Sequence, residues 1–244
     1  LAACCIKVTC PQTRMSSQPK SQPTLLSIEG LSVEFADGKA RSVKAVRGVS
    51  LTVKKGEMAA VVGESGSGKT AFAMSIVRLL PKAGRITSGK IYLDGVDLLS
   101  ADDALLRSVR GRRVGVIFQD PMSSLNPYLT IGRQITEVTE LHLGLSRREA
   151  REHAKEMLDL VGIADPAKRF DQYPHEFSGG MRQRVMIAIA VSCKPDLVIA
   201  DEPTTALDPT IQAQVLDLLD DLRARMGMGV ILISHDLALV SGRA

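Results

Sequence analysis

Residues 63–70 read GESGSGKT and contain the residue types that hold a nucleoside triphosphate. They fit the pattern G-x-x-x-x-G-K-[ST] in full, and an apolar stretch precedes them while a helical pattern follows. Glycines let backbone N–H groups close around a β-phosphate, Lys69 neutralises β- and γ-phosphate oxygens, and the Thr70 hydroxyl binds Mg²⁺. The predicted nucleotide contacts are Gly63, Glu64, Ser65, Gly66, Ser67, Gly68, Lys69 and Thr70.

A second reactive group lies in DLVIADEP, where an apolar run ends in two acidic residues. Leu197 to Ala200 predict a buried strand, so Asp201 emerges at its carboxyl end, beside the phosphates of a parallel α/β sheet. We expect Asp201 to hold Mg²⁺, directly or through water. Glu202 points differently and suits the polarisation of a water molecule for attack on a γ-phosphate. Adjacent acids also occur on ordinary surfaces, and the glycine loop favours the catalytic interpretation.

The stretch FSGGMRQR, residues 177–184, resembles another phosphate-binding site. A hydroxyl and two glycines begin a predicted helix, and a helix N-terminus with bare N–H groups attracts anions. Ser178, Gly179 and Gly180 are therefore further candidates for phosphate contact. One chain with two such loops, far apart in sequence, needs an explanation.

The elements that position these residues alternate between strands and helices. Apolar, β-branched strands separated by helices predict an α/β fold with a largely parallel sheet covered on both faces. The predicted strands are residues 25–35, 43–53, 57–63, 89–95, 113–120, 196–203 and 229–236. The predicted helices of this core are residues 70–80, 102–111, 179–193 and 211–226.

Residues 121–177 have a different character from the rest of the chain. Two helical patterns with many exposed charges dominate, at residues 130–143 and 146–162, and no strand pattern occurs between them. We interpret this segment as a helical insertion into the α/β core.

Composition limits the possible classes of function. The hydrophobic content of 45%, with 24% charged residues, is that of a soluble globular protein. A net charge of +4 is too small to indicate nucleic acid as a partner. No apolar run reaches the roughly 18 residues that span a bilayer, so we expect any membrane role to be peripheral. Cys193 ends an apolar helix and is predicted to be a small core residue.

The N-terminal segment is polar and without periodicity. We expect residues 1–24 to be a disordered or artefactual leader, with residues 1–14 a product of upstream readthrough or misassigned start. Residues 25–244 form the predicted globular domain.

The order of motifs resembles that of ATP-binding cassette (ABC) ATPases, the motor subunits of ABC transporters. The resemblance covers residues 25–244 and six motifs: GESGSGKT, Gln119 after an apolar strand, FSGGMRQR, VIADEP, TTALDP and LISHD. It implies a P-loop NTPase core of the RecA type, with an antiparallel β subdomain and a helical insertion, and ATP and Mg²⁺ as ligands. Phe177 stands where the family usually has Leu, and Met181 where Gln is frequent.

The resemblance also implies roles for single residues. Gln119 matches the glutamine that senses Mg²⁺ and the attacking water while linking core to insertion. His235 matches the switch histidine that contacts the γ-phosphate, and Asp208 matches a loop that crosses to a partner subunit. Phe35 matches the aromatic residue that stacks on adenine, although a Phe at the end of a strand equally suits the core.

In the family, the second phosphate loop serves ATP that is held by another subunit. Two ATP molecules are buried between two head-to-tail subunits, and each site is completed in trans. The resemblance therefore predicts a second ABC ATPase subunit as partner, identical or homologous, and poor hydrolysis by the monomer.

Two stretches, FQDPMSSLNPYLTIGRQI and YPHEFSGGMRQRVMIAIA, resemble ATPases of bacterial dipeptide, oligopeptide and nickel importers. That branch implies two transmembrane permease subunits, a periplasmic binding protein as indirect partner, and a peripheral location on the cytoplasmic face of the inner membrane. The insertion would receive a short helix from the membrane partner. Family members continue beyond the position of Ala244, so we expect a C-terminally truncated domain.

Other functions stay open at this point. A non-transport cassette ATPase that acts on DNA or ribosomes would carry a long coiled-coil insertion or two cassettes, and this chain has neither pattern. A P-loop kinase or GTPase leaves FSGGMRQR and TTALDP unexplained. Within transport, nickel or another small solute is the alternative to di- or oligopeptides.

Overall fold

A computed structural model describes residues 7–9, 23–36, 42–205 and 207–236. The predicted leader, residues 1–24, lies mostly outside these ranges. Its residues Lys7–Thr9 form strand β1, which pairs antiparallel with a strand of the core. The predicted C-terminal truncation lies outside the described residues, which end at residue 236.

The central sheet is built from short, apolar strands. Its order is β1-β4-β9-β8-β7, with β4 (Met58–Val62), β7 (Val114–Ile117), β8 (Leu197–Asp201) and β9 (Gly229–Ser234) parallel to one another. Every residue of β4, β8 and β9 is buried, as expected for parallel strands that are covered on both faces. The carboxyl ends of these strands therefore meet at one edge, where ligands bind in open parallel sheets.

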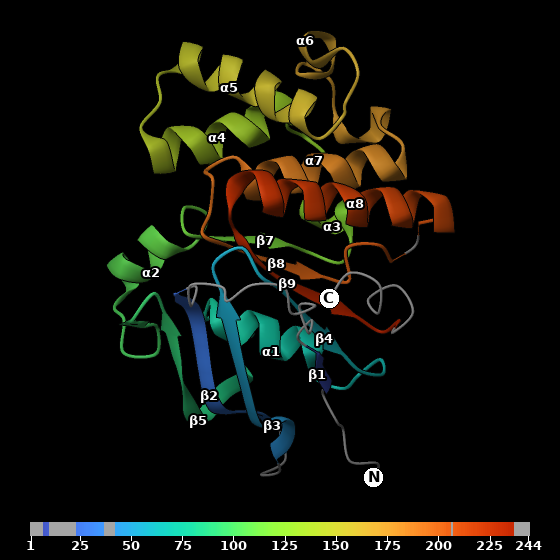
Figure 1. The fold of residues 1–244 in the computed structure, drawn as a ribbon. Helices are drawn as coiled ribbons and strands as arrows, with labels where there is room; N and C mark the ends of the chain where they lie inside the picture. The colour runs from blue at the N-terminus through green and yellow to red at the C-terminus, as the bar shows by residue number, and fades with distance from the viewer. Residues whose placement is uncertain (1–6, 10–22, 37–41, 206, 237–244) are drawn as a thin grey trace, which may run out of the picture.

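A second, antiparallel sheet of order β3-β2-β5-β6 lies below the first in Figure 1. Its strands are β2 (Thr24–Ala36), β3 (Ser42–Lys54), β5 (Gly84–Leu93) and β6 (Val96–Asp97). Helix α1 (Lys69–Ile76) lies between the two sheets and is largely buried.

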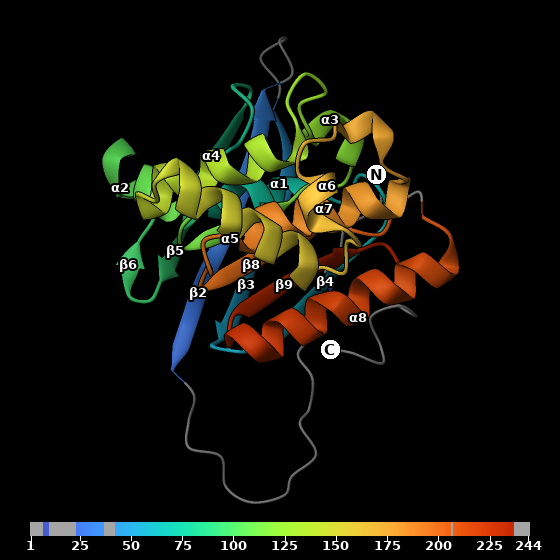
Figure 2. The same cartoon turned by 90° about the horizontal axis from the view of Figure 1, so that it is seen from above.

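The remaining helices lie mainly on the other face of the central sheet. In Figures 1 and 2, α4, α5 and α7 are stacked above the strands, and α8 runs along the side of α7. Their bounds are α2 Asp103–Val109, α3 Pro121–Ser124, α4 Ile131–Leu143, α5 Arg147–Leu160, α6 Pro166–Arg169, α7 Gly179–Val191 and α8 Pro209–Met226, with a 3₁₀ turn at Pro174–Glu176. Residues 121–177, all of them described, contain helices and loops but no strand, and their status as an insertion stays a prediction.

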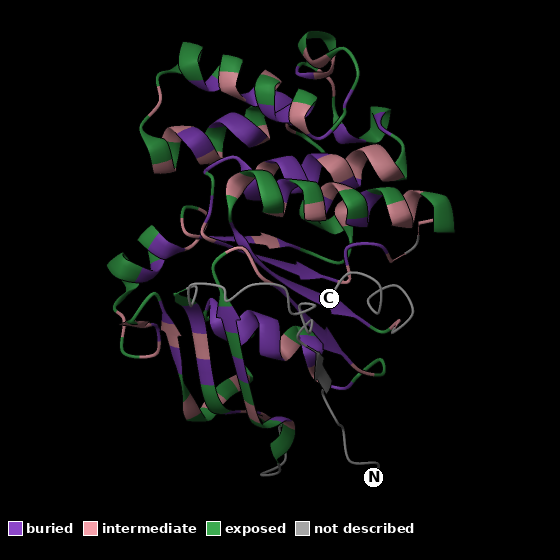
Figure 3. Ribbon diagram, in the orientation of Figure 1, coloured by how far each residue is buried: buried purple, intermediate pink, exposed green. Residues whose placement is uncertain are grey.

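The two faces of each central strand belong to two separate hydrophobic clusters. In β8, Val198 and Ala200 face the helical side, whereas Leu197 and Ile199 face α1 and the antiparallel sheet. This alternation follows from the two-residue period of a strand. Figure 3 shows the buried sheet between helices whose outer faces are exposed. The sheet edge that carries the site is thus held rigidly from both sides.

One helix is shorter than the sequence predicts. We expected a helix over residues 70–80, ending before Pro81, but α1 ends at Ile76. Arg78 adopts a left-handed conformation with φ 52°, and the N–H groups of Arg78 and Leu79 bond back to Ser75 O and Met74 O. These two bonds satisfy the last carbonyl groups and end the helix, as in a Schellman motif. The Arg78 guanidinium is itself held by the Ala101 carbonyl at 2.6 Å.

Candidate nucleotide-hydrolysis site

The loop at residues 63–70 connects buried strand β4 to helix α1. Gly66 and Gly68 have φ angles of 76° and 92°, in the region that favours glycine. A side chain at Gly68 would also collide with the backbone carbonyl of Ala45 in β3. The glycines therefore allow a tight loop that is pressed against the neighbouring β subdomain.

Lys69 is the first residue of α1, and its side chain is 4% exposed. Its ammonium donates to the carbonyl oxygens of Gly63 at 2.7 Å and Glu64 at 2.9 Å. It also lies 3.4 Å from Glu202 Oε1. The ammonium group is thus held against its own loop by two carbonyl oxygens, which phosphate oxygens would replace as acceptors.

Asp201 ends β8 and is 2% exposed. Burial raises the pKa of its carboxyl group and neighbouring Glu202 adds to the rise, while a hydrogen bond from the Thr70 hydroxyl and the Lys69 charge act against it. Among the described residues, Asp201 Oδ1 has no hydrogen-bond partner. A buried carboxylate oxygen without a partner is costly unless a cation or water binds it. Asp201 and Thr70 supply the oxygen ligands that Mg²⁺ uses together with substrate phosphates.

Glu202 has an unusual backbone conformation for a side chain of its size. Its φ is 47°, and its N–H donates to Ile233 O in β9 at 3.0 Å. Burial raises the pKa of its carboxyl group, but hydrogen bonds from Thr205 and His235 and the charge of Lys69 outweigh burial, so the net pKa is lowered. Glu202 is therefore held as a carboxylate, the state needed to accept a proton or orient water.

Two further side chains reach Glu202 from neighbouring strand ends. Gln119, just after β7, donates from Nε2 to Glu202 Oε2 at 3.3 Å. His235, just after β9, has Nδ1 3.1 Å from the same oxygen. The structure thus brings together Lys69, Thr70, Asp201, Glu202, Gln119 and His235.

The second phosphate loop lies elsewhere in the structure. Ser178 is the N-cap of α7 and accepts from Met181 N at 3.3 Å, and both Ser178 and Gly179 are exposed. Phe177, in contrast, is 2% exposed and anchors the loop in the helical layer. The helix N-terminus is thereby fixed in direction but open to solvent.

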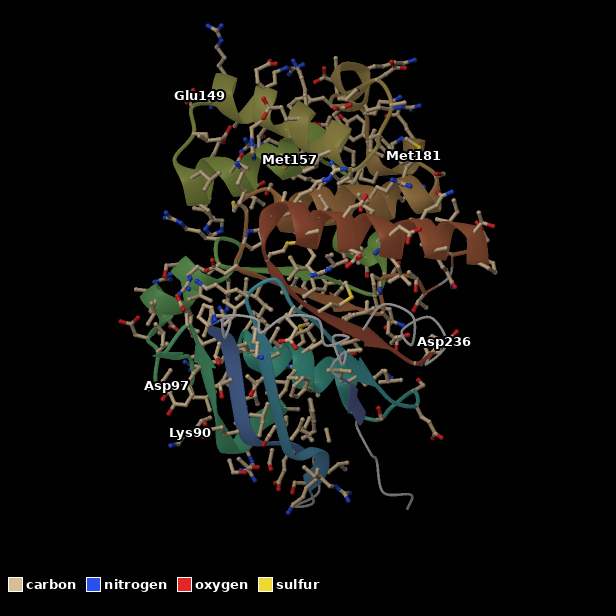
Figure 4. The ribbon with its side chains drawn as sticks, viewed as in Figure 1. Lys90, Asp97, Glu149, Met157, Met181 and Asp236 are labelled. Carbon is tan, nitrogen blue, oxygen red and sulfur yellow. The ribbon has the colours of Figure 1, made fainter. Side chains whose placement is uncertain are left out.

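Asp208 belongs to this second region as well. It is the N-cap of α8 and accepts from Ile211 N at 3.0 Å. A Cβ at Gly180 would lie 3.0 Å from the Ile211 side chain, so the starts of α7 and α8 are adjacent. In Figure 4, Met181 in α7 and Asp236 after β9 lie on the same side of the molecule at different heights.

Phe35 lies near the end of β2 and pairs with Val43 of β3. Its ring packs against Gly84 and the lower hydrophobic cluster, so it is partly a core residue. Its contact with adenine stays a prediction.

Two contributors to the site were not identified from the sequence. Thr205 donates from its hydroxyl to Glu202 Oε2 at 3.1 Å. The Ala45 carbonyl packs against Gly68 and leaves no room for a side chain there. The spacing of three residues between Glu202 and Thr205, which suits a tight turn, was the available signal for Thr205. No sequence signal marks a backbone contact such as that of Ala45.

Comparison with known proteins gives consistent matches. A family model described as ABC transporter matches residues 46–205. The chain is 52% identical over 229 residues to "Probable peptide ABC transporter ATP-binding protein y4tR" of Sinorhizobium fredii, covering 93% of this chain and 68% of the relative. It is 48% identical over 221 residues to "Oligopeptide transport ATP-binding protein OppD" of Bacillus subtilis, covering 90% of this chain and 62% of the relative.

Solved structures are similar as well. The ATP-binding cassette MJ0796, in a dimeric post-hydrolysis state bound to ADP and Pi, has a TM-score of 0.75 at 28% identity, with 88% of this chain and 90% of that chain covered. The cbiO1 protein of Clostridium perfringens, part of an ABC transporter complex, has a TM-score of 0.73 at 26% identity, with 89% and 80% covered. These likenesses confirm the predicted fold class.

Proposed function

This chain belongs to the ABC transporter family, and from that premise we propose that it is the ATP-hydrolysing subunit of a bacterial peptide importer. One observation carries the proposal: the strand ends gather a complete set of hydrolytic side chains, while the loop of Ser178 stands apart and exposed. The alternative of a cassette ATPase that acts on DNA or ribosomes is not favoured by the matched relatives.

In the proposed reaction, Lys69 donates to the β- and γ-phosphate oxygens in place of the carbonyls of Gly63 and Glu64. Glu202, held ionised by its donors, accepts a hydrogen bond from water and orients it towards the γ-phosphorus. His235 and Gln119 lie close enough to Glu202 to contact the γ-phosphate and the same water. Mg²⁺ at Asp201 and Thr70 would neutralise charge on the phosphate oxygens.

A second subunit completes each site in this proposal. Ser178 and the N–H groups of Gly179 and Gly180 bind the γ-phosphate of ATP held by the partner, and the dipole of α7 favours that charge. Asp208 caps the adjacent helix α8, and in this proposal its loop contacts the partner subunit at the same interface. Support comes from the exposure of Ser178 and Gly179 and from the dimeric state named for the similar cassette MJ0796.

We place the subunit on the cytoplasmic face of the inner membrane, bound to two permease subunits that receive peptide from a periplasmic binding protein. In the described part of the chain, no helix has the length and apolar character needed to span a bilayer. A hollow of about 270 Å³ between α4 and the core is lined by apolar side chains that include Leu79, Phe118 and Val138. Such a surface suits a short helix of the permease.

The choice of peptide as the solute rests on the names of the relatives. The chain spans about two thirds of the length of the first relatives that it matches. Nickel or another small solute is the alternative. Uptake of labelled di- and oligopeptides by a strain that lacks this gene decides between them, since restored uptake of peptide, and not of nickel, is expected on complementation.

Hydrolysis itself is tested by the dependence of the rate on protein concentration. If two subunits share each site, the activity per molecule rises steeply with concentration and then saturates. Full specific activity at dilutions where gel filtration finds only monomer would contradict the shared site.

A further inference from the structure

Glu202 sits at the first position of a tight turn that follows β8. Its N–H is tied to Ile233 O, and its own carbonyl accepts from Thr205 N at 3.2 Å, which closes the turn. The left-handed φ of 47° aims the side chain away from the direction that the strand would give it. A glutamate in this conformation is strained, and it persists because its surroundings hold it.

The Thr205 hydroxyl reaches back across this turn to Glu202 Oε2 at 3.1 Å. The same oxygen accepts from Gln119 Nε2 and lies 3.1 Å from His235 Nδ1, while Oε1 faces Lys69. The donors differ in how firmly they are held. His235 has 57% of its side chain exposed and Gln119 is also exposed, whereas Thr205 is half-buried and only three residues from its acceptor.

We propose that Thr205 is a positioning residue for hydrolysis: its hydroxyl holds the Glu202 carboxylate while Gln119 and His235 engage water and nucleotide. This inference rests on the proposed function. Lys69, Gln119 and His235 each exchange a contact with Glu202 for a contact with ATP or water. The Thr205 bond lies within one turn, so nucleotide has no need to break it, and the carboxylate keeps its aim.

The test compares Thr205→Val with Thr205→Ser in the full chain. Val keeps the β-branched shape and removes the hydroxyl, whereas Ser keeps the hydroxyl and removes the methyl group. Loss of one hydrogen bond to a charged group corresponds to a fall of about ten-fold or more in kcat for the Val variant. KM and the affinity for ATP stay within about two-fold of the wild type, and Ser restores kcat to within about two-fold.

Thr139→Val is the matched control, because it removes a buried hydroxyl that bonds only to carbonyl groups within α4. Its kcat is expected to equal that of the wild type. Wild-type kcat in Thr205→Val overturns the inference, as does an equal loss in the Val and Ser variants, which would assign the effect to the shape of the turn. A wild-type chain without any concentration-dependent hydrolysis would instead overturn the proposed function, and the inference with it.

Discussion

The two glycine-containing loops of this chain both precede a helix, but they differ in how far they are buried. At residues 63–70 the loop is closed upon itself: Lys69 is buried, bonded to loop carbonyls and beside Glu202. At residues 177–180 the loop is open: Phe177 is buried, but Ser178 and Gly179 face solvent. Both precede a helix whose N-terminus attracts anions.

The difference lies in what each loop finds around it in the fold. The first loop follows β4, and the next two strands of the sheet, β9 and β8, end just before His235 and at Asp201, which Glu202 follows. The second loop starts a helix of the outer layer, next to the start of α8, and no side chain of the first site bonds to it among the described residues. The first loop is thus surrounded by a cation, acids and a histidine from within the chain, whereas the second offers a helix N-terminus and a hydroxyl, which we propose a partner subunit uses.

The largest expected effect comes from removing the charge of the closed loop. Lys69→Met should weaken ATP affinity by at least about thirty-fold, because truncating a buried charged partner costs about 2 kcal/mol or more. Fluorescence titration with an ATP analogue measures it. Lys82→Met, which removes an exposed lysine, is the control and should bind like the wild type. Unchanged affinity in the Lys69 variant would remove the distinction between the loops.

Ser178→Arg affects the open loop and separates turnover from binding. A large cation there blocks the partner's nucleotide, so concentration-dependent hydrolysis should disappear while ATP affinity stays within about two-fold.

The control for Ser178→Arg is Ser146→Arg, because Ser146 is likewise an N-cap serine and its loss costs α5 a similar cap of about 1 kcal/mol. The Ser146 variant should keep its hydrolysis. Loss of ATP binding in the Ser178 variant would show that this loop serves the chain's own nucleotide.

Glycine-to-alanine variants contrast the space in the two loops. Gly68→Ala meets the Ala45 carbonyl at φ 92°, so a loss of about 2–4 kcal/mol in the free energy of unfolding is expected. Gly179→Ala finds its nearest neighbour, Leu207, at 3.8 Å, and stability should change by less than about 1 kcal/mol. Chemical denaturation measures both. Equal losses would mean that the open loop is as tightly packed as the closed one.

The smallest effect concerns His142, which lies in α4 beside Gly111, and serves as a reference for stability alone. Burial, with a contribution from the Arg112 charge, lowers the pKa of His142 below its usual 6.5. The unfolded chain therefore binds a proton that the folded chain refuses, and stability falls as pH drops from 6.5 towards the lowered pKa. In His142→Gln this part of the acid-side fall in melting temperature should vanish, with ATP affinity unchanged. An identical pH profile in both proteins would contradict it.

Much of the fold was predictable because local patterns agree with the tertiary structure. The apolar run before Asp201 became β8, and the pattern at residues 179–193 became α7, ending at Val191. The end of α1 was not predictable, because Arg78 takes a left-handed conformation that a distant carbonyl, that of Ala101, helps to hold. For the site, Asp201, Glu202 and His235 lie at or just after the ends of the expected strands, whereas Thr205 and Ala45 act through turn geometry and backbone contact that residue type does not reveal.

The sequence by itself determined which side chains are available and at which element ends they stand, since glycine spacing, apolar runs and cap residues are local properties. Only the tertiary structure decided which of these ends meet. The order β4-β9-β8-β7 places Lys69, Gln119 and His235 around the Glu202 carboxylate, although they are up to 166 residues apart in the chain. Sheet order is set by the burial of both strand faces, a balance over the whole core that no short stretch of residues contains.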